Sequence, residues 1–409
     1  MKKSEVPEKW RNMRPQTLKV LKARNWHDPR EHKDGALTPD EQGLSGPIQT
    51  SIAYGFQWAD DAASVFQGMR GYAYPRLPYG TPAVQKLGKK ILDLELGKNH
   101  PNKNDYDVLI SASGMSSIAA LTLALVPFGG EFISSPYVYG GTYNLFNDFL
   151  PQTGRKCFFI KDPRDLDEWE SMMKCRPMAS FLFWENDPNP TPFKLDGAGI
   201  VRRAQKYRKR TFCDNTIPTP ILEQPLLYGV DGVIESTSKN IGGKSRGLGG
   251  SNSARKEIIK EIRESWAVVL GAIMDPRVAD YMLLGIKTLK KRMERKIKNA
   301  RCIAGYLEDS GIARKVYWSG SDLLSFELEG SLEEAKRLVE NFRFILMAPH
   351  LGDDCPLGIH PASTTHARVP PEERLKLGIA DTLIRLSPGL VDPLDVVDDI
   401  DQAHHSVYV

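Results

Sequence analysis

Residues 235–250 read ESTSKNIGGKSRGLGG and follow a short apolar stretch, 232–234, that predicts a β-strand. The hydroxyls of Ser236 and Ser238 stand three and one residues before Lys239, a spacing that suits a phosphate group held beside an amine. Residues 243–245 imitate the end of a nucleotide-binding P-loop, but that pattern requires glycine at position 238, where this chain has serine. The alternative for this segment taken alone is a solvated loop rich in glycine and serine.

Further along the chain in both directions, apolar strand candidates alternate with helical patterns. The expected strands are 107–111, 131–134, 180–184, 211–213 and 232–234, and the expected helices include 84–92 and 199–208. This alternation predicts an α/β fold with a mainly parallel sheet covered by helices on both faces. After residue 270, a helix over 278–306 precedes a strand at 323–328, which predicts a separate α+β lobe. We therefore expect an N-terminal arm (1–65), a large domain (66–270) and a small C-terminal domain (271–409).

Two more turn-rich segments follow expected strands, where ligands of open α/β sheets bind. Residues 113–117 (SGMSS) join a strand to a helix, and a helix N-terminus favours an anion, although a plain helix cap is the alternative. Asp214 follows the strand 211–213 and is equally readable as a cap or turn residue. Together the three segments supply what pyridoxal 5′-phosphate (PLP) requires: a lysine for an imine, an acid for the ring nitrogen and a phosphate cradle.

The chain resembles the Cys/Met-metabolism family of PLP enzymes, which includes cystathionine γ-synthase, the cystathionine lyases, methionine γ-lyase and O-acetylhomoserine sulfhydrylase. The resemblance extends from about residue 54 to 403 and rests on ordered motifs at 111–115, 139–143, 189–190, 214–220, 236–239, 360–366 and 384–389. It implies PLP fold type I, like aspartate aminotransferase, with a mainly parallel sheet in the large domain and a smaller α+β C-terminal domain. It also implies a homotetramer built from two catalytic dimers.

The resemblance implies roles for residues around the cofactor. Lys239 would hold PLP as a Schiff base and later move protons, and Asp214 would pair with the ring nitrogen. Tyr139 would stack on the ring and act as an acid or base, whereas a core aromatic is the alternative for this residue alone. The other implied cofactor contacts are Ser113, Gly114, Met115, Asn189, Ser236 and Ser238, with Asn189 at the ring hydroxyl and the rest at the phosphate.

Three further roles concern the substrate and the neighbouring subunit. Arg385 would clamp the α-carboxylate of an amino-acid substrate with its planar fork, whereas a surface ion pair is the alternative. His350 stands where the family usually has a serine that orients the substrate. Tyr74 and Arg76 would reach the phosphate of a neighbouring subunit.

Departures from the family pattern gather around the substrate rather than the cofactor. They are the loop 77–82, the basic Arg246 in place of an acid, His350, and Cys355 in place of a glutamate used by the cystathionine enzymes. Gly141 replaces the cysteine of methionine γ-lyases, and residues 351–353 and 360–366 look most like the O-acetylhomoserine sulfhydrylase branch. The expected reaction is γ-elimination or γ-replacement on a sulfur-containing or O-activated homoserine-type amino acid.

Other readings of the chain stay open at this point. A β-lyase of the cysteine or cystathionine type, a divergent member acting on an unusual γ-substituted amino acid, and a PLP-binding homologue without turnover all fit the motifs. The sequence leaves open which amino acid is the substrate and whether a nucleophile is added.

The remaining composition predicts an ordinary cytoplasmic protein. Five scattered cysteines indicate a reducing compartment, and neither a secretory signal nor an apolar stretch of membrane-spanning length is visible. The spacing of His360, His366 and Cys355 matches no common zinc pattern, so we expect no metal. The net charge of +4 gives little reason to expect a nucleic-acid partner, and the basic run 290–298 is typical of an amphipathic helix with a solvated basic face.

Overall fold

The computed structural model describes residues 48–67, 74–76, 80–367 and 369–408. From residue 51 onward the described residues form one compact unit, which contains both sheets. Most of the expected arm (1–47) and part of the reshaped loop (77–79) lie outside the described residues. The described end of the arm, 48–65, contains most of helix α2 (Ala59–Phe66).

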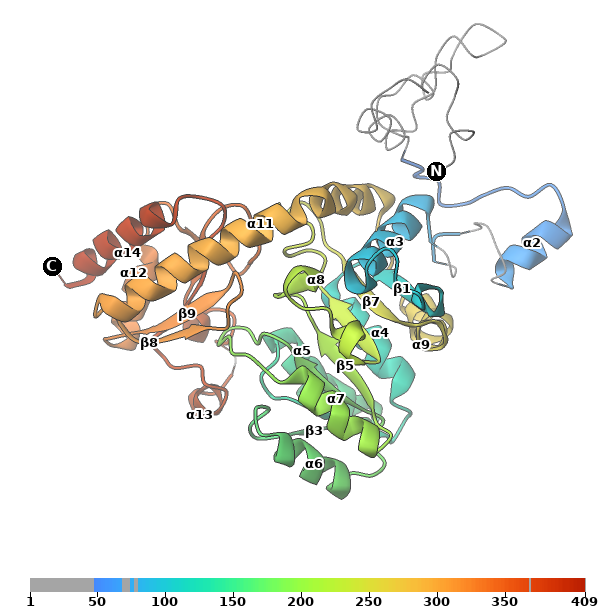
Figure 1. Cartoon of the computed structure of the whole chain (residues 1–409), viewed down its shortest axis with the longest axis horizontal. Coiled ribbons are helices and arrows are strands. Elements are labelled where there is room, and N and C mark those ends of the chain that lie inside the picture. Colours follow the sequence, from blue (N-terminus) through green and yellow to red (C-terminus); the bar gives the residue numbers. More distant parts are fainter. Residues whose placement is uncertain (1–47, 68–73, 77–79, 368, 409) are drawn as a thin grey trace, which may run out of the picture. The chain divides into compact units, whose positions relative to one another are not determined.

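A seven-stranded sheet forms the centre of the large lobe, in the order β1-β7-β6-β5-β4-β2-β3 (Figure 1). The pairs from β6 through β3 are parallel, and β7 runs antiparallel to both of its neighbours. The strands are β1 (Tyr106–Ser111), β2 (Glu131–Ser134), β3 (Lys156–Phe159), β4 (Phe181–Glu185), β5 (Arg210–Asp214), β6 (Gly232–Glu235) and β7 (Gly250–Arg255). The expected mainly parallel sheet is confirmed.

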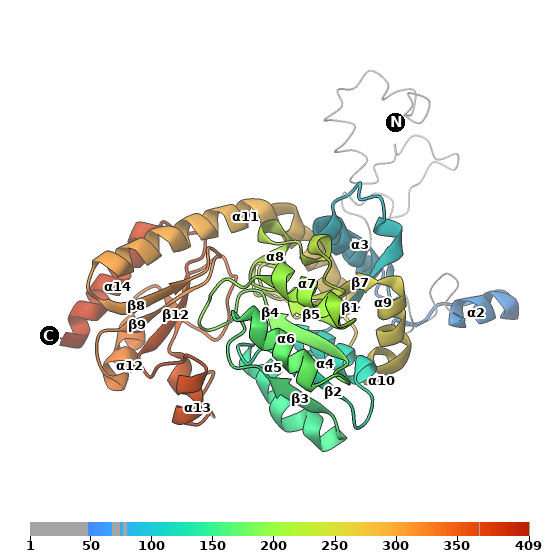
Figure 2. The same cartoon turned by 60° about the horizontal axis from the view of Figure 1, so that its bottom comes forward.

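Both faces of this sheet are buried, which explains its continuous apolar strands. In β4, Leu182 and Trp184 pack into one core with α3, α6, α7 and the start of α11, whereas Phe181 and Phe183 pack into a second core with α4 and α9 (Figure 2). Successive side chains of a strand point to opposite faces, so one apolar run serves two cores. The helices of this lobe are α3 (Pro82–Leu96), α4 (Gly114–Leu125), α5 (Gly140–Asn144), α6 (Leu166–Cys175), α7 (Gly197–Lys206), α8 (Thr219–Leu222), α9 (Lys256–Ile262) and α10 (Val268–Leu270).

A second sheet of five strands, in the order β10-β11-β12-β9-β8, has its own apolar core. Its strands are β8 (Ala313–Trp318), β9 (Leu324–Leu328), β10 (Leu346–Met347), β11 (Leu357–Ile359) and β12 (Leu383–Ser387). The accompanying helices are α11 (Pro276–Asp309), α12 (Leu332–Glu340), α13 (Pro371–Lys376) and α14 (Pro393–Tyr408). Helix α11 packs against α3 of the first lobe and against α14 and β8 of the second (Figure 1).

The basic run 290–298 lies on α11, but the expectation of a fully solvated basic face is wrong. Arg292 is 5% exposed and Lys296 is fully buried. The Arg292 guanidinium donates to the carbonyl oxygens of Asn240 (2.8 Å) and Ile241 (3.3 Å), and Lys296 Nζ donates to the carbonyl oxygen of Gly352 (2.6 Å). In place of water, carbonyl oxygens of these loops accept the hydrogen bonds of the two cations, which offsets the cost of burying their charges.

In the described part of the chain, no helix has both the length and the apolar character needed to cross a bilayer. The same residues contain no cluster of three or more histidine, cysteine or acidic side chains placed to hold a metal ion.

Glu95 of α3 is a buried carboxyl group, and neither of its oxygens has a hydrogen-bond partner among the described residues. Burial, and secondarily the charge of Glu223, raise its pKa to about 8. Because this pKa lies above the ordinary value, the neutral acid stabilises the fold at low pH, and that contribution is lost as the pH rises through about 8.

Replacing Glu95 with glutamine keeps the shape and removes the ionisation. We expect Glu95→Gln to flatten the fall in melting temperature of the cofactor-free protein between pH 5 and pH 9, by on the order of a few degrees. Thermal unfolding of both proteins across this range measures the effect, with the exposed Glu264→Gln as the control. Parallel curves for wild type and Glu95→Gln would contradict the buried-acid interpretation.

Candidate active site

A cavity of about 210 Å³ opens where the parallel strands of the large sheet end. It is lined by the following residues singled out from the sequence: Ser113, Gly114, Met115, Tyr139, Asn189, Asp214, Ser236, Ser238, Lys239, His350 and Arg385. They come from seven separate segments between residues 113 and 385, so the fold brings together residues that lie far apart in the sequence. Tyr74 and Arg76 do not line this cavity.

The N-terminus of α4 lines one part of the cavity. Ser113 caps the helix: its hydroxyl accepts from the Ser116 N–H (3.1 Å), and the Ser116 hydroxyl accepts from the Ser113 N–H (2.9 Å). A side chain at Gly114 would place a Cβ 2.8 Å from the Cβ of Ser236, so glycine is needed for this close approach. Residues 113–117 can therefore cap α4 and also hold a phosphate, since the free backbone N–H groups at a helix start favour an anion.

Asp214 ends β5 as a partly exposed carboxyl group. Its Oδ1 accepts the Thr216 N–H (2.9 Å), and no described cation pairs with it. Burial raises its pKa to about 6. A protonated ring nitrogen would give this carboxylate the positive partner that the protein itself does not provide.

Tyr139 precedes α5 and lines the same cavity as Asp214. Its N–H donates to Glu185 Oε1 (2.6 Å), and its ring remains about half exposed in the cavity. A Cβ at position 141 would lie 2.7 Å from this ring, so Gly141 leaves the space that the Tyr139 side chain occupies.

Lys239 projects from a tightly bonded loop. The Ser238 hydroxyl accepts the Gly249 N–H (2.8 Å) and donates to the Gly249 carbonyl oxygen (3.1 Å), and the Gly243 N–H donates to the Lys239 carbonyl oxygen (2.8 Å). Burial, together with the nearby charge of Arg385, lowers the lysine pKa to about 8. A substantial fraction of the amine is thus neutral near pH 8, as a nucleophile or base requires.

Arg385 lies on β12 and is only 3% exposed. Its guanidinium donates to Asn189 Oδ1 (3.2 Å) and to the carbonyl oxygen of His350 (2.9 Å), while its Nε has no partner among the described residues. Burial lowers its pKa to about 10, which leaves it charged at neutral pH. Because Arg385 is buried, the interpretation as a surface ion pair is wrong. No carboxylate among the described residues pairs with it, so an anionic ligand would offset the cost of burying its charge.

Several lining residues have no role predicted from the sequence, although some lie within the motifs: Ile118, Thr142, Glu185, Asp187, Thr216, Ile217, Leu248, Pro349 and Leu351. Glu185 ends β4 as Asp214 ends β5, so the rule applied to Asp214 would have found it. The pKa of Asp187 is raised to about 7 by burial.

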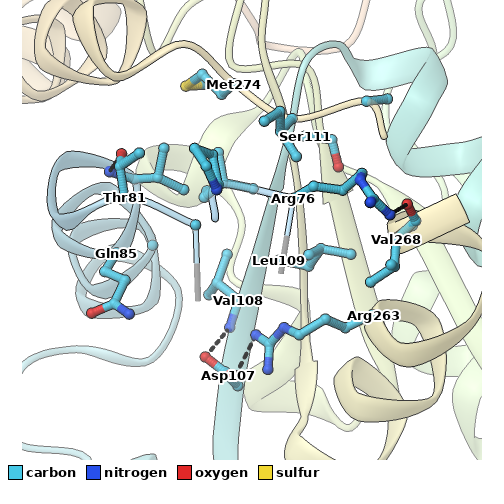
Figure 3. A pocket seen from close by; sticks show the side chains of 18 of the residues that line it. Arg76, Thr81, Gln85, Asp107, Val108, Leu109, Ser111, Arg263, Val268 and Met274 are labelled. Carbon is cyan, nitrogen blue, oxygen red and sulfur yellow. Dashed lines mark hydrogen bonds and ion pairs between the residues drawn. The ribbon is translucent and has the colours of Figure 1, made fainter. Parts of the chain in front are cut away.

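A larger cavity, of about 410 Å³, lies between α3, β1 and the segment 263–274 (Figure 3). Arg76 extends across it and donates to the carbonyl oxygen of Val268 (3.3 Å), and Arg263 pairs with Asp107 (2.7 Å). The Tyr74 ring lies 5.9 Å from the Arg76 guanidinium. These two residues therefore do not meet Lys239 within one chain.

Comparison with known proteins agrees with this arrangement. O-succinylhomoserine sulfhydrylase of Pseudomonas aeruginosa is 32% identical over 369 residues, covering 86% of this chain and 88% of that protein. An L-methionine gamma-lyase of Fusobacterium nucleatum subsp. nucleatum is 31% identical, covering 88% and 93%. A crystal structure of a putative O-acetylhomoserine (thiol)-lyase from Campylobacter jejuni, which contains a pyridoxyl-lysine monophosphate, superposes with a TM-score of 0.82 at 29% identity over 93% of this chain and 98% of that one.

The crystal structure shares the fold described above and carries its pyridoxyl group on a lysine. The sequence profile of the family described as "Cys/Met metabolism PLP-dependent enzyme" matches residues 32–405. The chain belongs to this family of PLP-dependent enzymes.

Proposed function

We propose that this enzyme catalyses γ-elimination or γ-replacement on a sulfur-containing or O-activated homoserine-type amino acid, with PLP held on Lys239. The observation that carries the proposal is that Lys239, Asp214 and Arg385 line one cavity. Among the described residues, Asp214 has no cationic partner and Arg385 has no carboxylate partner. When bound, PLP supplies an electron sink for the charge that develops at the substrate Cα.

The residues of the chain then have separate tasks. Arg385 binds the α-carboxylate and so fixes which substrate bond faces Lys239. Lys239, freed by the substrate amine, would take the α-proton, return it to the cofactor-bound substrate, and then, as a neutral amine again, take a proton from Cβ. Tyr139 packs over the cofactor ring and exchanges protons at its hydroxyl. His350 contacts the substrate from the loop between β10 and β11.

The cofactor contacts follow from the same cavity. Asp214 keeps the ring nitrogen protonated, and Asn189 faces the ring hydroxyl. The phosphate is assigned to Ser113, Gly114, Met115, Ser236 and Ser238, around the start of α4. Because Tyr74 and Arg76 lie away from this cavity, they serve the neighbouring subunit of a homotetramer.

Two further assignments complete the proposal. The division into an arm (1–65), a large domain (66–270) and a small domain (271–409) is supported by the separate cores of the two sheets. A cytoplasmic location is supported by the five cysteines, none of which forms a disulfide.

The proposed reaction is tested by incubating the holoenzyme with a panel of amino acids and identifying the 2-oxo acid released. Release of 2-oxobutyrate from O-acetylhomoserine, O-succinylhomoserine or methionine supports γ-chemistry. A cystathionine beta-lyase of Coxiella burnetii is also 30% identical to this chain, so a β-reaction is the competing candidate. Pyruvate from cysteine or cystathionine, without 2-oxobutyrate, would favour it.

Arg385→Ala removes the proposed carboxylate clamp and leaves Lys239 in place. We expect KM to rise about 100-fold, since lost charge-assisted hydrogen bonds cost roughly 1.5–3 kcal/mol. The absorbance of the bound cofactor should persist, which separates substrate binding from cofactor binding. Steady-state kinetics of Arg385→Ala and of the exposed Arg277→Ala control measure this, and equal KM values for the two variants would refute the clamp.

A further inference from the structure

His350 contacts Lys239 as well as facing the proposed substrate site, and binding of the substrate does not explain the contact with the lysine. The residue lies in the loop between β10 and β11, and its Nδ1 is 3.0 Å from Lys239 Nζ. Its own carbonyl oxygen accepts a hydrogen bond from Arg385 (2.9 Å). The imidazole is therefore fixed beside the amine by the same loop that meets the proposed carboxylate clamp.

This contact defines the protonation state of the ring. Below about pH 8 the Lys239 amine is mostly an ammonium group, which can only donate, so Nδ1 accepts and the neutral ring carries its proton on Nε2. Among the charged groups acting on the ring, Lys239, Arg385 and Lys296 are positive and Asp353 is negative. Burial, followed by the charge of Lys239, lowers the pKa of His350 to about 4, so the ring stays neutral at physiological pH.

The second nitrogen of the ring, Nε2, is buried and has no hydrogen-bond partner among the described residues. An unsatisfied buried N–H costs about 1–3 kcal/mol, so its retention favours a role with a ligand. His350 also lines the cavity that contains Lys239.

We propose that His350 passes the proton collected by Lys239 to the leaving group of the substrate. This inference rests on the proposed function. As the bond from Cγ to the leaving sulfur or oxygen breaks, its electron pair departs with that atom, which takes the proton from Nε2. In the same step the Lys239 ammonium gives a proton to Nδ1.

The outcome is balanced. The proton that Lys239 removed from the substrate has in effect reached the leaving group, and the lysine is again a neutral base. The imidazole remains uncharged and has changed tautomer; proton exchange with water after product release restores the first one. No imidazolium is formed, which suits the cationic surroundings of the ring.

The proposal predicts a dependence on the leaving group. A thiolate leaves poorly without a proton, whereas the carboxylate of an acyl ester leaves readily as an anion. His350 should therefore matter for thioether substrates such as methionine and hardly at all for O-acetylhomoserine. A residue that only positions Lys239 would affect both substrates equally.

The kinetic test uses His350→Asn, because asparagine keeps an acceptor near the Nδ1 position but cannot carry a proton. We expect kcat for release of methanethiol from methionine to fall about 100-fold, the lower end of the usual contribution of a general acid. Elimination from O-acetylhomoserine should slow less than about threefold by the same argument. Equal loss on both substrates, or loss on neither, would overturn the proposal; the exposed His405→Asn is the matched control.

A second measurement does not depend on turnover. In the cofactor-free full-length protein labelled with ¹⁵N-histidine, the signals missing from His350→Asn identify the ring. We expect an unprotonated Nδ1 and a protonated Nε2, with no titration between pH 6 and pH 9. A protonated Nδ1, or titration near the ordinary histidine pKa, would overturn the relay, whereas a wild-type enzyme that neither releases a 2-oxo acid nor forms a γ-replacement product with an added thiol would instead refute the proposed function.

Discussion

Replacing Lys239 with alanine is expected to abolish both the covalent attachment of the cofactor and the reaction. The lysine is partly buried and its amine has a lowered pKa, and no other lysine lines the cavity in the described part of the chain. Removing a residue that acts as both nucleophile and base should reduce kcat by more than about 10⁴-fold. This is the largest effect that we expect from any single substitution.

Borohydride reduction of the holoenzyme followed by peptide mapping locates the linkage directly. The pyridoxyl group should be found on Lys239 in wild type and on no lysine in Lys239→Ala. Lys244→Ala is the matched control, because this exposed lysine lies in the same loop. A pyridoxyl group on another lysine of the wild-type protein would show that the central assignment is wrong.

The second large effect is expected for Asp214→Asn. An amide has nearly the shape of the carboxylate and can still accept the Thr216 N–H, but it carries no charge for the ring nitrogen. We expect kcat to fall about 10³-fold, as when one preorganised electrostatic contact is lost from an active site. The exposed Asp148→Asn should leave kcat unchanged.

The negative charge of Asp214 should lower the stability of the cofactor-free protein and raise the stability of the holoenzyme. The raised pKa of about 6 means that ionised Asp214 destabilises the cofactor-free protein above pH 6. Asp214→Asn should therefore raise the melting temperature of the cofactor-free protein at pH 8 and lower that of the holoenzyme. A change of the same sign in both forms would contradict pairing between Asp214 and the cofactor.

The fold was largely predictable because the central strands are buried on two faces. Such strands are continuous apolar runs, as in Phe181–Glu185, and they stand out against amphipathic helices. The strand β7 was missed because its sequence, GSNSAR, contains no large apolar residue. It is buried by its neighbours: a Cβ at Gly250 would lie 2.3 Å from the Ser113 carbonyl oxygen, so small residues are what this position permits.

The candidate site was predictable to the extent that its residues follow strands or match family motifs. Spacing along α11 could identify an apolar stripe through Leu289 and Met293, but it could not show what packs beside that stripe. Arg292 and Lys296 were therefore assigned to solvent, although loop carbonyls bury them. The contact between His350 and Lys239 joins residues 111 positions apart, and no local pattern encodes it.

The burial of these two cations has a consequence for attempts to redesign the enzyme. Arg292 and Lys296 tie the loop after Lys239 and the loop after His350 to consecutive turns of one helix. Grafting either loop from a relative would displace carbonyl oxygens that accept hydrogen bonds from at least one of these buried cations, so loop exchange is a poor route to a new substrate preference. Side chains that these anchored loops present, such as His350 and Leu351, can be varied while the scaffold keeps its connections, and a mutant library should begin there.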